Sequence, residues 1–461
     1  MTRPPFEVAD VIRTTGSRFH EHNLLTWPQL KVLDAIARCR TAALGGHRDQ
    51  CSNCGYQAIS YNSCRNRHCP KCQTNARDQW LAKRQQELLP VEYYHLVFSV
   101  PHALVPLMWQ NKRHLFALLF QASADTLLEV AADPRQLGAQ TGLLSILHSW
   151  GQTLQPHPHI HCVVPGGGLS PDHTRWISSP SNFFLPVKVL SRVFRGKFVA
   201  GLRRAFRSHQ LRFYGEGVAL AEEKNFTAFL GSLVQQDWVV YAKPPFGGPE
   251  HVLHYLARYT HRVAISNHRL LTVTDNQVAF RWKDYAHGSK QRTMTLSPEE
   301  FLRRFLQHVL PRGFPRIRYF GWMANRTRGE MIPLCRRLLH QPSPATDAAL
   351  SSQPAAWPCP RCQGPCTSSS GLPQHRSSLP KPDRHVPMTH PDRTLNPATC
   401  LMPPAMLPEP VLCTSIQAMR TGKSTTLHGS DAYPMRTLDL SGSLLPRFPR
   451  VSRLISAIEN P

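Results

Sequence analysis

The stretch HPHIHCVVPGGG at residues 157–168 has the alternating pattern of a β-strand that ends in a turn. Successive side chains on a strand point to opposite faces, so His159 and His161 lie together while the apolar residues between and after them face the other layer. Two imidazoles on one strand can bind a metal ion and leave positions free for a third protein ligand, water and a substrate oxygen. The stretch therefore predicts a strand that carries a catalytic metal site.

Other strand-like segments surround this one. YYHLVFSV at 93–100 is rich in aromatic and β-branched residues and stops at Pro101, LLSILHSW ends at residue 150, and a turn near Gln155 leads into the histidine strand. Helical patterns separate the segments, the longest from about residue 104 to 132. Short strands with hairpin-like spacing among helices predict an α+β fold around a mainly antiparallel sheet.

The charge of the chain points to its partner. Its 461 residues include 54 Lys and Arg against 29 Asp and Glu, a formal net charge of +25. Such an excess favours a polyanionic partner, and nucleic acid is the first candidate. No run of eighteen apolar residues occurs, and the opening MTRPPFEVADVIRTTG lacks the apolar core of a signal peptide. We therefore expect a soluble, intracellular protein that binds DNA and has no membrane partner.

Composition also predicts the domain boundaries. Of the 41 prolines, 20 follow residue 340, but only three of the 40 aromatic residues do. A Pro/Ser/Thr-rich segment with few aromatics cannot bury enough surface to offset its ordering entropy, which predicts a disordered tail at 341–461. Two helical patterns bracket a cysteine-rich stretch and end at Pro90, which predicts a small N-terminal unit at 1–90 and a catalytic domain at 91–340.

Four cysteines near the N-terminus form two Cys-x-x-Cys pairs, fourteen residues apart: Cys51 with Cys54, and Cys69 with Cys72. Together they can present four thiolates to one tetrahedral Zn²⁺, and a site closed by four protein ligands is structural. Three neighbours are reserve ligands that could replace one of these or bind a second ion: His47, Cys64 and His68. A later trio in the predicted tail is a weak candidate for metal binding: Cys359, Cys362 and Cys366.

Basic residues lie among these cysteines, including Arg65 and Arg67. On a small rigid module they predict a face that contacts DNA phosphates. The alternative is that these charges only solvate the module.

A helical pattern that begins near residue 249 carries two tyrosines, Tyr255 and Tyr259, four residues apart. This spacing places both phenols on one helix face, about 6 Å from each other, with Arg258 and Arg262 alongside. Tyrosines so spaced more often pack than react. Beside a metal-binding histidine pair, however, a phenol can attack a phosphodiester, so both tyrosines are candidate nucleophiles.

Three segments, in this order, resemble the insertion sequence ninety-one (IS91) family of transposases: SCRNRHCPKCQ at 63–73, HPHIHCVVPGGGL at 157–169 and YLARYTHRVAISNHRL at 255–270. The resemblance runs from about residue 20 to 340. It implies an HUH single-strand nuclease with an RRM-like antiparallel sheet and an N-terminal zinc-binding domain.

The resemblance also implies roles for single residues. His159 and His161 match the HUH histidines, and Tyr255 and Tyr259 match the two-tyrosine motif. Related enzymes take a third polar metal ligand from elsewhere, for which Gln152 and His157 are both candidates. The implied catalytic ion is Mg²⁺ or Mn²⁺, because it must hold a hard phosphate oxygen and exchange quickly, whereas Zn²⁺ suits the thiolates.

The implied activity is rolling-circle-type transposition in the bacterial cytoplasm, at the nucleoid. A tyrosine attacks single-stranded DNA at the ends of the element, including hairpin ends, and forms a 5′-phosphotyrosine. Two other functions compete with this one. A rolling-circle replication initiator or relaxase-like HUH endonuclease would share the histidines and tyrosines but not the zinc segment, and a non-enzymatic zinc-finger protein leaves both motifs unexplained.

Overall fold

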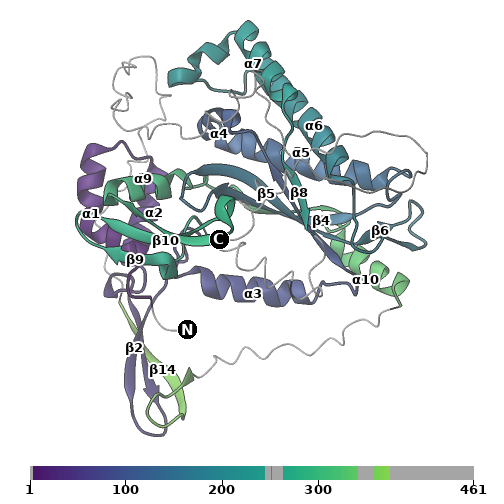
Figure 1. The fold of residues 1–461 in the computed structure, drawn as a ribbon. Coiled ribbons are helices and arrows are strands. Elements are labelled where there is room, and N and C mark those ends of the chain that lie inside the picture. The colour runs from purple at the N-terminus through teal and green to yellow at the C-terminus, as the bar shows by residue number, and fades with distance from the viewer. Residues whose placement is uncertain (1–3, 244–250, 252–262, 341–356, 374–461) are drawn as a thin grey trace, which may run out of the picture. The chain divides into compact units, whose positions relative to one another are not determined.

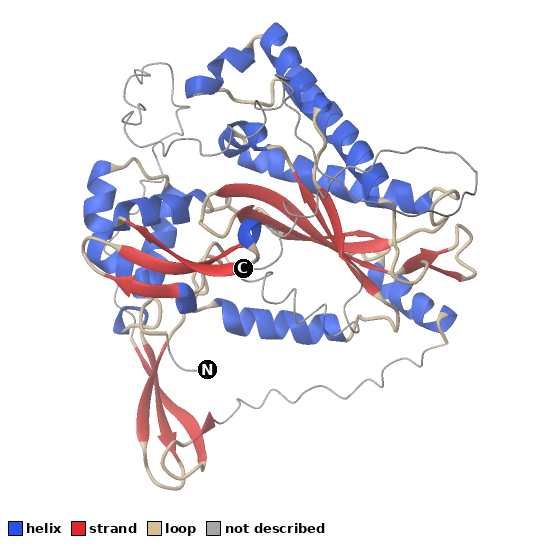
Figure 2. Ribbon diagram, viewed as in Figure 1, coloured by secondary structure: helices blue, strands red, loops and turns tan. Residues whose placement is uncertain are grey.

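The computed structural model describes residues 4–243, 251, 263–340 and 357–373. Its central element is a five-stranded sheet in the order β12-β4-β5-β3-β8, with every neighbouring pair antiparallel (Figure 1). The strands are β3 (Tyr93–Ser99), β4 (Gly142–Trp150), β5 (Pro156–Pro165), β8 (Val240–Lys243) and β12 (Ile317–Gly321). The histidine strand is β5, in the middle of the sheet. The prediction of a mixed fold around an antiparallel sheet is confirmed (Figure 2).

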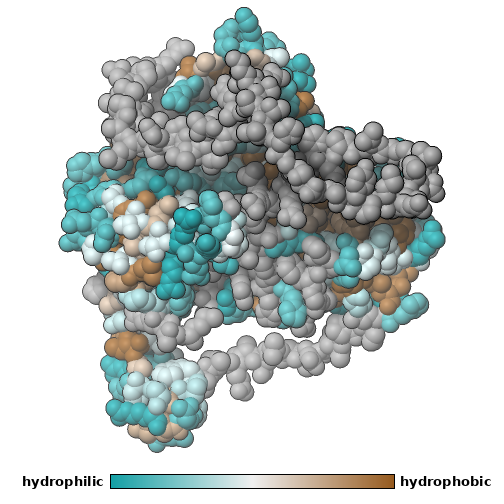
Figure 3. Space-filling model, in the orientation of Figure 1, coloured by the Kyte–Doolittle hydropathy of each residue, from teal (hydrophilic) through white to brown (hydrophobic). Residues whose placement is uncertain are grey.

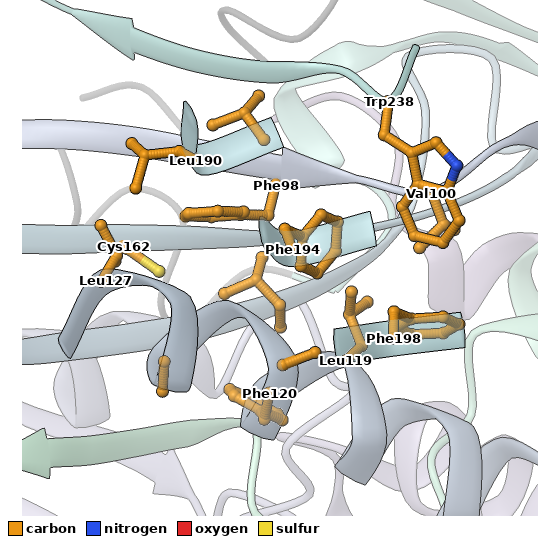
Figure 4. Close-up of a cluster of buried hydrophobic side chains, with 14 of the residues drawn as sticks. Phe98, Val100, Leu119, Phe120, Leu127, Cys162, Leu190, Phe194, Phe198 and Trp238 are labelled. Carbon is orange, nitrogen blue, oxygen red and sulfur yellow. The ribbon is translucent and has the colours of Figure 1, made fainter. Parts of the chain in front are cut away.

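Helices cover one face of this sheet and share its largest hydrophobic core. They are α4 (Val105–Gln110), α5 (Lys112–Ala132), α6 (Val187–Arg207) and α7 (Glu223–Gln235). On α6 the buried residues Leu190, Phe194 and Phe198 recur every four residues and so form one apolar stripe. Phe98 of β3 packs edge-on against Phe194, and Trp238 packs edge-on against both Phe194 and Phe198 (Figure 4). The core therefore lies between β3–β5 and these helices.

The two faces of β5 differ as its alternation predicts. Ile160, Cys162 and Val164 belong to the core beneath α5 and α6. The residues between them point the other way, where Val163 packs in a smaller cluster with Trp80 of helix α3 (Gln73–Gln85). The histidines of β5 alternate with the core residues and so lie on the α3 side of the sheet. Helix α10 (Arg328–Leu338) follows β12 at the edge of the sheet.

A second hydrophobic core joins the N-terminal helices to residues much later in the chain. It includes helices α1 (Val8–His22), α2 (Trp27–Arg38) and α9 (Pro298–Gln307) and the antiparallel strands β9 (Leu270–Val273), β10 (Val278–Asp284) and β11 (Lys290–Leu296). Phe19, Ile36, Phe280 and Phe301 are all buried in this one cluster. The predicted boundary at residue 90 therefore does not separate two cores, because helices before it are buried against residues far beyond it.

A four-stranded sheet in the order β13-β14-β1-β2 carries the N-terminal cysteine hairpin. Its strands are β1 (Gly46–Cys51), β2 (Gln57–Tyr61), β13 (Trp357–Pro358) and β14 (Pro365–Leu372). Strand β14 pairs with the whole length of β1, from Gly46 to Cys51, and Asp49 of β1 accepts hydrogen bonds from Ser60 of β2 and Ser368 of β14. The surface over β2 and β14 is mostly hydrophilic (Figure 3).

This sheet corrects the prediction of a disordered tail that begins at residue 341. Residues 357–358 and 365–372 form strands, whereas residues 341–356 and 374–461 lie outside the described part. The composition concealed the strands because β14 needs no core of its own: the backbone of β1 supplies its hydrogen bonds. A polar CTSSS segment is compatible with a strand that takes its stability from a neighbour.

The glycines after the histidine strand allow two backbones to approach closely. They begin a hairpin of β6 (Gly167–Leu169) and β7 (Trp176–Ser178). Gly167 has φ 148°, and a side chain there would lie 2.4 Å from the Ile177 carbonyl oxygen. A side chain at Gly168 would lie 2.4 Å from the Gln140 carbonyl oxygen.

Of the helices in the described residues, α5 is the one long and apolar enough to cross a membrane by length and composition. Most of α5 is buried against the sheet and α6, as expected for the core helix of a globular domain.

Candidate functional site

Three buried histidines on neighbouring strands form the candidate catalytic centre. His159 and His161 come from β5, and His148 comes from β4, where the antiparallel register places it directly opposite His159. One ring nitrogen from each lies within 4.8 Å of the others, and the Nε2 atoms of His159 and His161 are 3.0 Å apart. The predicted pairing of the two β5 histidines on one face is thus present, with a third imidazole beside it.

Hydrogen bonds orient these rings. Nδ1 of His159 donates to the His157 carbonyl oxygen at 2.7 Å, and Nδ1 of His161 lies 2.8 Å from Nε2 of His95, a buried residue of β3. When each Nδ1 carries the proton, both Nε2 atoms keep a lone pair for a metal ion. His148 stacks on Trp150 with ring centroids 4.6 Å apart. The neighbouring residues therefore hold the rings in a metal-binding orientation.

Burial keeps the imidazoles neutral. It lowers the pKa of His159 and of His161 well below 6.5, and it lowers the pKa of His95 to about 3. Near pH 7 these rings carry no charge, and neutral imidazole is the form that binds metal ions. The arrangement can therefore hold a divalent cation without first losing protons.

The structure places neither predicted third ligand in this cluster. His157 contributes its carbonyl oxygen to His159, and the side-chain oxygen of Gln152 accepts a hydrogen bond from the Lys283 backbone N–H at 3.4 Å. His148 takes the third position instead. A signal for it was present in the sequence, since LLSILHSW was predicted to be a strand before a tight turn and its histidine shares the strand face of Ile146.

The first cysteine cluster consists of Cys39, Cys64, Cys69 and Cys72, with one sulfur atom of each within 4.8 Å of the rest. Sulfur atoms of Cys39 and Cys72 are 3.4 Å apart, and those of Cys64 and Cys72 are 3.5 Å apart. Hydrogen bonding from Cys64 lowers the pKa of Cys39 to about 7, and bonding from Cys39 lowers the pKa of Cys72. Hydrogen bonds to Cys39 raise the pKa of Cys64 and of Cys69, so the metal-free cluster holds its protons on these two thiols, and a zinc ion would replace them.

The second cysteine cluster consists of Cys51 and Cys54, at the turn between β1 and β2, with Cys359 and Cys362, between β13 and β14. Sulfur atoms of Cys51 and Cys362 are 3.5 Å apart, and those of Cys54 and Cys359 are 3.6 Å apart. The backbone N–H of Cys54 lowers the pKa of Cys51 to about 6. Cys366, which pairs with Cys51 across the strands, is buried beside this group but is not one of its four members.

The prediction of one site made by Cys51, Cys54, Cys69 and Cys72 is therefore wrong in its grouping. Strand β2 carries the chain back from the first pair to the second, and five residues at about 3.3 Å each span roughly 16 Å. Sulfur atoms from both pairs could not reach one zinc ion across that distance, so each pair needs partners from elsewhere. Cys64 is one of those partners, and the trio that seemed weak in the sequence supplies two others.

The other reserve ligands lie outside both cysteine clusters in the part of the chain described here. His68 is buried and accepts a hydrogen bond from the Leu310 N–H at 3.3 Å. Arg67, predicted to contact DNA, donates to the carbonyl oxygens of Pro311 and Phe314 at 3.0 and 2.5 Å. Arg65 is exposed.

His47 lies on β1, away from the four sulfur atoms of either cluster. The candidate nucleophiles and the arginines beside them lie outside the described residues: Tyr255, Arg258, Tyr259 and Arg262.

Comparisons with known proteins agree with these centres. Residues 142–330, which contain the three histidines, match a family described as "Putative transposase", and residues 11–100 match the transposase zinc-binding domain of the IS91 type. The chain is 53% identical over 346 residues to "Putative transposase y4qJ" of Sinorhizobium fredii, an alignment that covers 75% of this chain and 87% of that protein. The chain belongs to the IS91 family of transposases.

A second relative of this IS91 family transposase is the transposase for insertion sequence element IS801 of Pseudomonas savastanoi pv. phaseolicola. The two are 28% identical over 334 residues, which is 71% of this chain and 78% of the relative. No solved structure matches the chain. Membership of the family makes this a protein that acts on DNA, and the zinc-binding domain with its cysteine clusters supports structural zinc.

Proposed function

We propose that this IS91 family transposase cleaves and rejoins single-stranded DNA at the ends of its insertion sequence through a 5′-phosphotyrosine intermediate. The observation that carries the proposal is the cluster of His148, His159 and His161 on one face of an antiparallel sheet, inside the region that matches the transposase family. The helices α5 and α6 on the other face support an RRM-like HUH domain. The substrate would be DNA of the bacterial cytoplasm.

The donor set fits a divalent cation. Three imidazoles converge, and for two of them, His159 and His161, the opposite ring nitrogen is engaged, which is the usual arrangement of metal-binding histidines. Imidazole nitrogen suits Mn²⁺ better than Mg²⁺, which prefers oxygen ligands, so we expect Mn²⁺ to support activity at lower concentration. When bound, the cation supplies positive charge at the scissile phosphate.

The tyrosines then provide the nucleophile. The phenolic oxygen of Tyr255 or Tyr259 forms a bond to the scissile phosphorus, and the bond from phosphorus to the 3′ oxygen breaks. The phenol loses its proton to solvent or a neighbouring base, and the departing oxygen becomes a 3′-hydroxyl. Because one phosphoester replaces another, the reverse attack by a 3′-hydroxyl rejoins DNA without an external energy source. Arg258 and Arg262 would stabilise the phenolate, since a phenol with a pKa of about 10 is otherwise a weak nucleophile.

Two tyrosines four residues apart in the sequence suit a reaction with two strands. One can hold the first 5′ end while the other attacks a second strand, so that neither end leaves the protein. The zinc-binding region with Arg65 would contact the DNA, including hairpin ends, through its phosphates.

The test uses one oligonucleotide from the end of the element, labelled at either terminus and incubated with full-length protein and Mn²⁺. A 3′ label should move to the protein band and survive denaturant, whereas a 5′ label should appear on a shortened strand that a polymerase can extend. The double variant Tyr255→Phe, Tyr259→Phe should form no adduct and still bind Mn²⁺. An adduct at the wild-type rate from that double variant would show that the nucleophile lies elsewhere.

A further inference from the structure

A cavity of about 360 Å³ lies where three distant segments of the chain meet. Its walls come from the first turns of α2, from Asn66–His68 beside the first cysteine cluster, and from residues 309–313 after α9. The volume is within the range of pockets that bind small molecules and cofactors. The three-histidine cluster is not part of its lining, so the cavity is a separate candidate site.

The cavity combines an aromatic ring with positive charge. Trp27 lines it with 36% of its surface exposed, so its ring is accessible to a ligand. The Lys31 ammonium lies over the Trp27 ring, 5.2 Å from its centroid, and Arg312 is an exposed member of the lining. An aromatic face for a base beside cations for a phosphate is the combination that binds single-stranded nucleic acid.

One wall of the cavity also carries an oriented donor. The side-chain oxygen of Asn66 accepts two hydrogen bonds from His68, one from its backbone N–H at 2.9 Å and one from Nδ1 at 3.1 Å. With its oxygen so engaged, the amide presents its NH₂ group as a donor that an acceptor on a base edge can meet.

The opposite wall is held in place before any ligand arrives. His68 Nε2 accepts from the Leu310 N–H, and the Arg67 guanidinium binds the carbonyl oxygens of Pro311 and Phe314. A cavity that is already ordered avoids the entropy cost of arranging its walls on binding.

We infer that this cavity binds one nucleotide of the DNA substrate in an unstacked state, with the base against Trp27 and the phosphate beside Lys31 and Arg312. A base inside a duplex cannot enter without being unstacked and unpaired, so the cavity favours positions in single strands, hairpin loops or mismatches. The inference rests on the action of the family on DNA and not on the proposed cleavage chemistry.

The test measures binding of a fluorescent single-stranded oligonucleotide from the element's end to full-length, zinc-loaded protein without added Mn²⁺ or Mg²⁺. Trp27→Ala should weaken binding about tenfold or more, and Trp27→Phe should retain most of the affinity because a ring remains. Lys31→Ser should lower the dependence of log affinity on log salt by about 0.7, the value for one phosphate contact on a single strand, whereas Trp27→Ala should leave that slope unchanged. Phe183→Ala and Lys224→Ser, which alter an exposed ring and an exposed lysine elsewhere, are the matched controls.

A cross-linking experiment on the wild-type protein tests the inference without relying on variants that could misfold. Single-stranded DNA with 5-iodouracil, irradiated on the wild-type protein, should cross-link to the peptide that contains Trp27. Wild-type affinity in Trp27→Ala together with an unchanged salt slope in Lys31→Ser would overturn the inference. An equal loss on single-stranded and blunt duplex DNA, or cross-links confined to other peptides, would also overturn it. None of these outcomes bears on whether a tyrosine forms the covalent adduct.

Discussion

The sulfur atoms of Cys51 and Cys362 lie 3.5 Å apart although 311 residues separate them in the chain. The first belongs to the N-terminal hairpin, and the second follows the region that matches the transposase family. Strand β14 continues from this contact and pairs with β1 as far as Gly46. The zinc-binding unit is therefore completed by residues that lie beyond the matched zinc-binding domain.

Truncation should separate the two zinc sites. We expect full-length protein to contain two zinc ions per chain, and a chain that lacks residues 345–461 to contain one, because it loses Cys359 and Cys362. A chain that lacks only residues 382–461 keeps every ligand and should contain two. Metal analysis of the three proteins, purified without chelator, checks this. Two zinc ions in the shorter protein would contradict the proposed grouping.

His148 should matter to catalysis and Gln152 should not. His148→Ala removes one of three imidazoles, so we expect Mn²⁺ affinity and the rate of adduct formation to fall at least a hundredfold. Gln152→Ala removes a long hydrogen bond to the Lys283 backbone at a residue outside the three-histidine cluster, and is the control, with less than a threefold effect expected. Calorimetric titration with Mn²⁺ and the labelled oligonucleotide assay give the two readouts. Equal losses in both variants would restore Gln152 as a ligand.

His95 should act through His161. His95→Ala removes the partner of His161 Nδ1, so we expect Mn²⁺ affinity to fall roughly 10- to 100-fold, as for other partners of metal-binding histidines. His157→Ala is the matched control, because the carbonyl oxygen that orients His159 belongs to the backbone and remains. The paramagnetic resonance signal of free Mn²⁺ reports the affinity. If His95→Ala binds Mn²⁺ as tightly as wild type, the 2.8 Å contact has no orienting role.

His308 should make the fold sensitive to acid. Burial lowers its pKa from 6.5 to about 3, while Nε2 donates to the Leu154 carbonyl oxygen at 2.9 Å and Nδ1 lies 3.1 Å from the Ser149 hydroxyl. The unfolded chain binds a proton at this residue below pH 6.5 and the folded chain does not, so folding stability falls as pH decreases toward 3.

His308→Asn removes this titration. Since one pKa unit corresponds to about 1.4 kcal/mol, the stability advantage of wild type over the variant should shrink by about 2 kcal/mol between pH 7 and pH 5. Urea denaturation at both values measures the difference, and comparison with the variant cancels the other buried histidines. A difference that is independent of pH would show that the pKa of His308 is the same in the folded and the unfolded chain, so that burial does not lower it.

Much of the fold follows from local sequence patterns. Alternation along residues 157–164 predicts a strand with histidines on one face and apolar residues on the other, and the structure has both. Side-chain direction on a strand is fixed by the backbone of that strand alone, so the sequence suffices for it. The same holds for Cys-x-x-Cys pairs, whose two sulfur atoms meet through a turn of four residues. For this reason the family motifs could be located without knowledge of the fold.

The sequence by itself thus determined strands β3, β4 and β5 of the histidine sheet, the partner class and two ligands of each metal centre, whereas tertiary structure decided how the ligand sets are completed. His148 joins His159 only through the register between β4 and β5, and His95 reaches His161 from β3 on the other side. Cys359 and Cys362 reach the hairpin through the pairing of β14 with β1. The ligands of one metal ion must lie within a few ångströms of each other. Spacing along the chain does not tell which distant strands will lie side by side. Register, which depends on the whole sheet and its core, supplies that information.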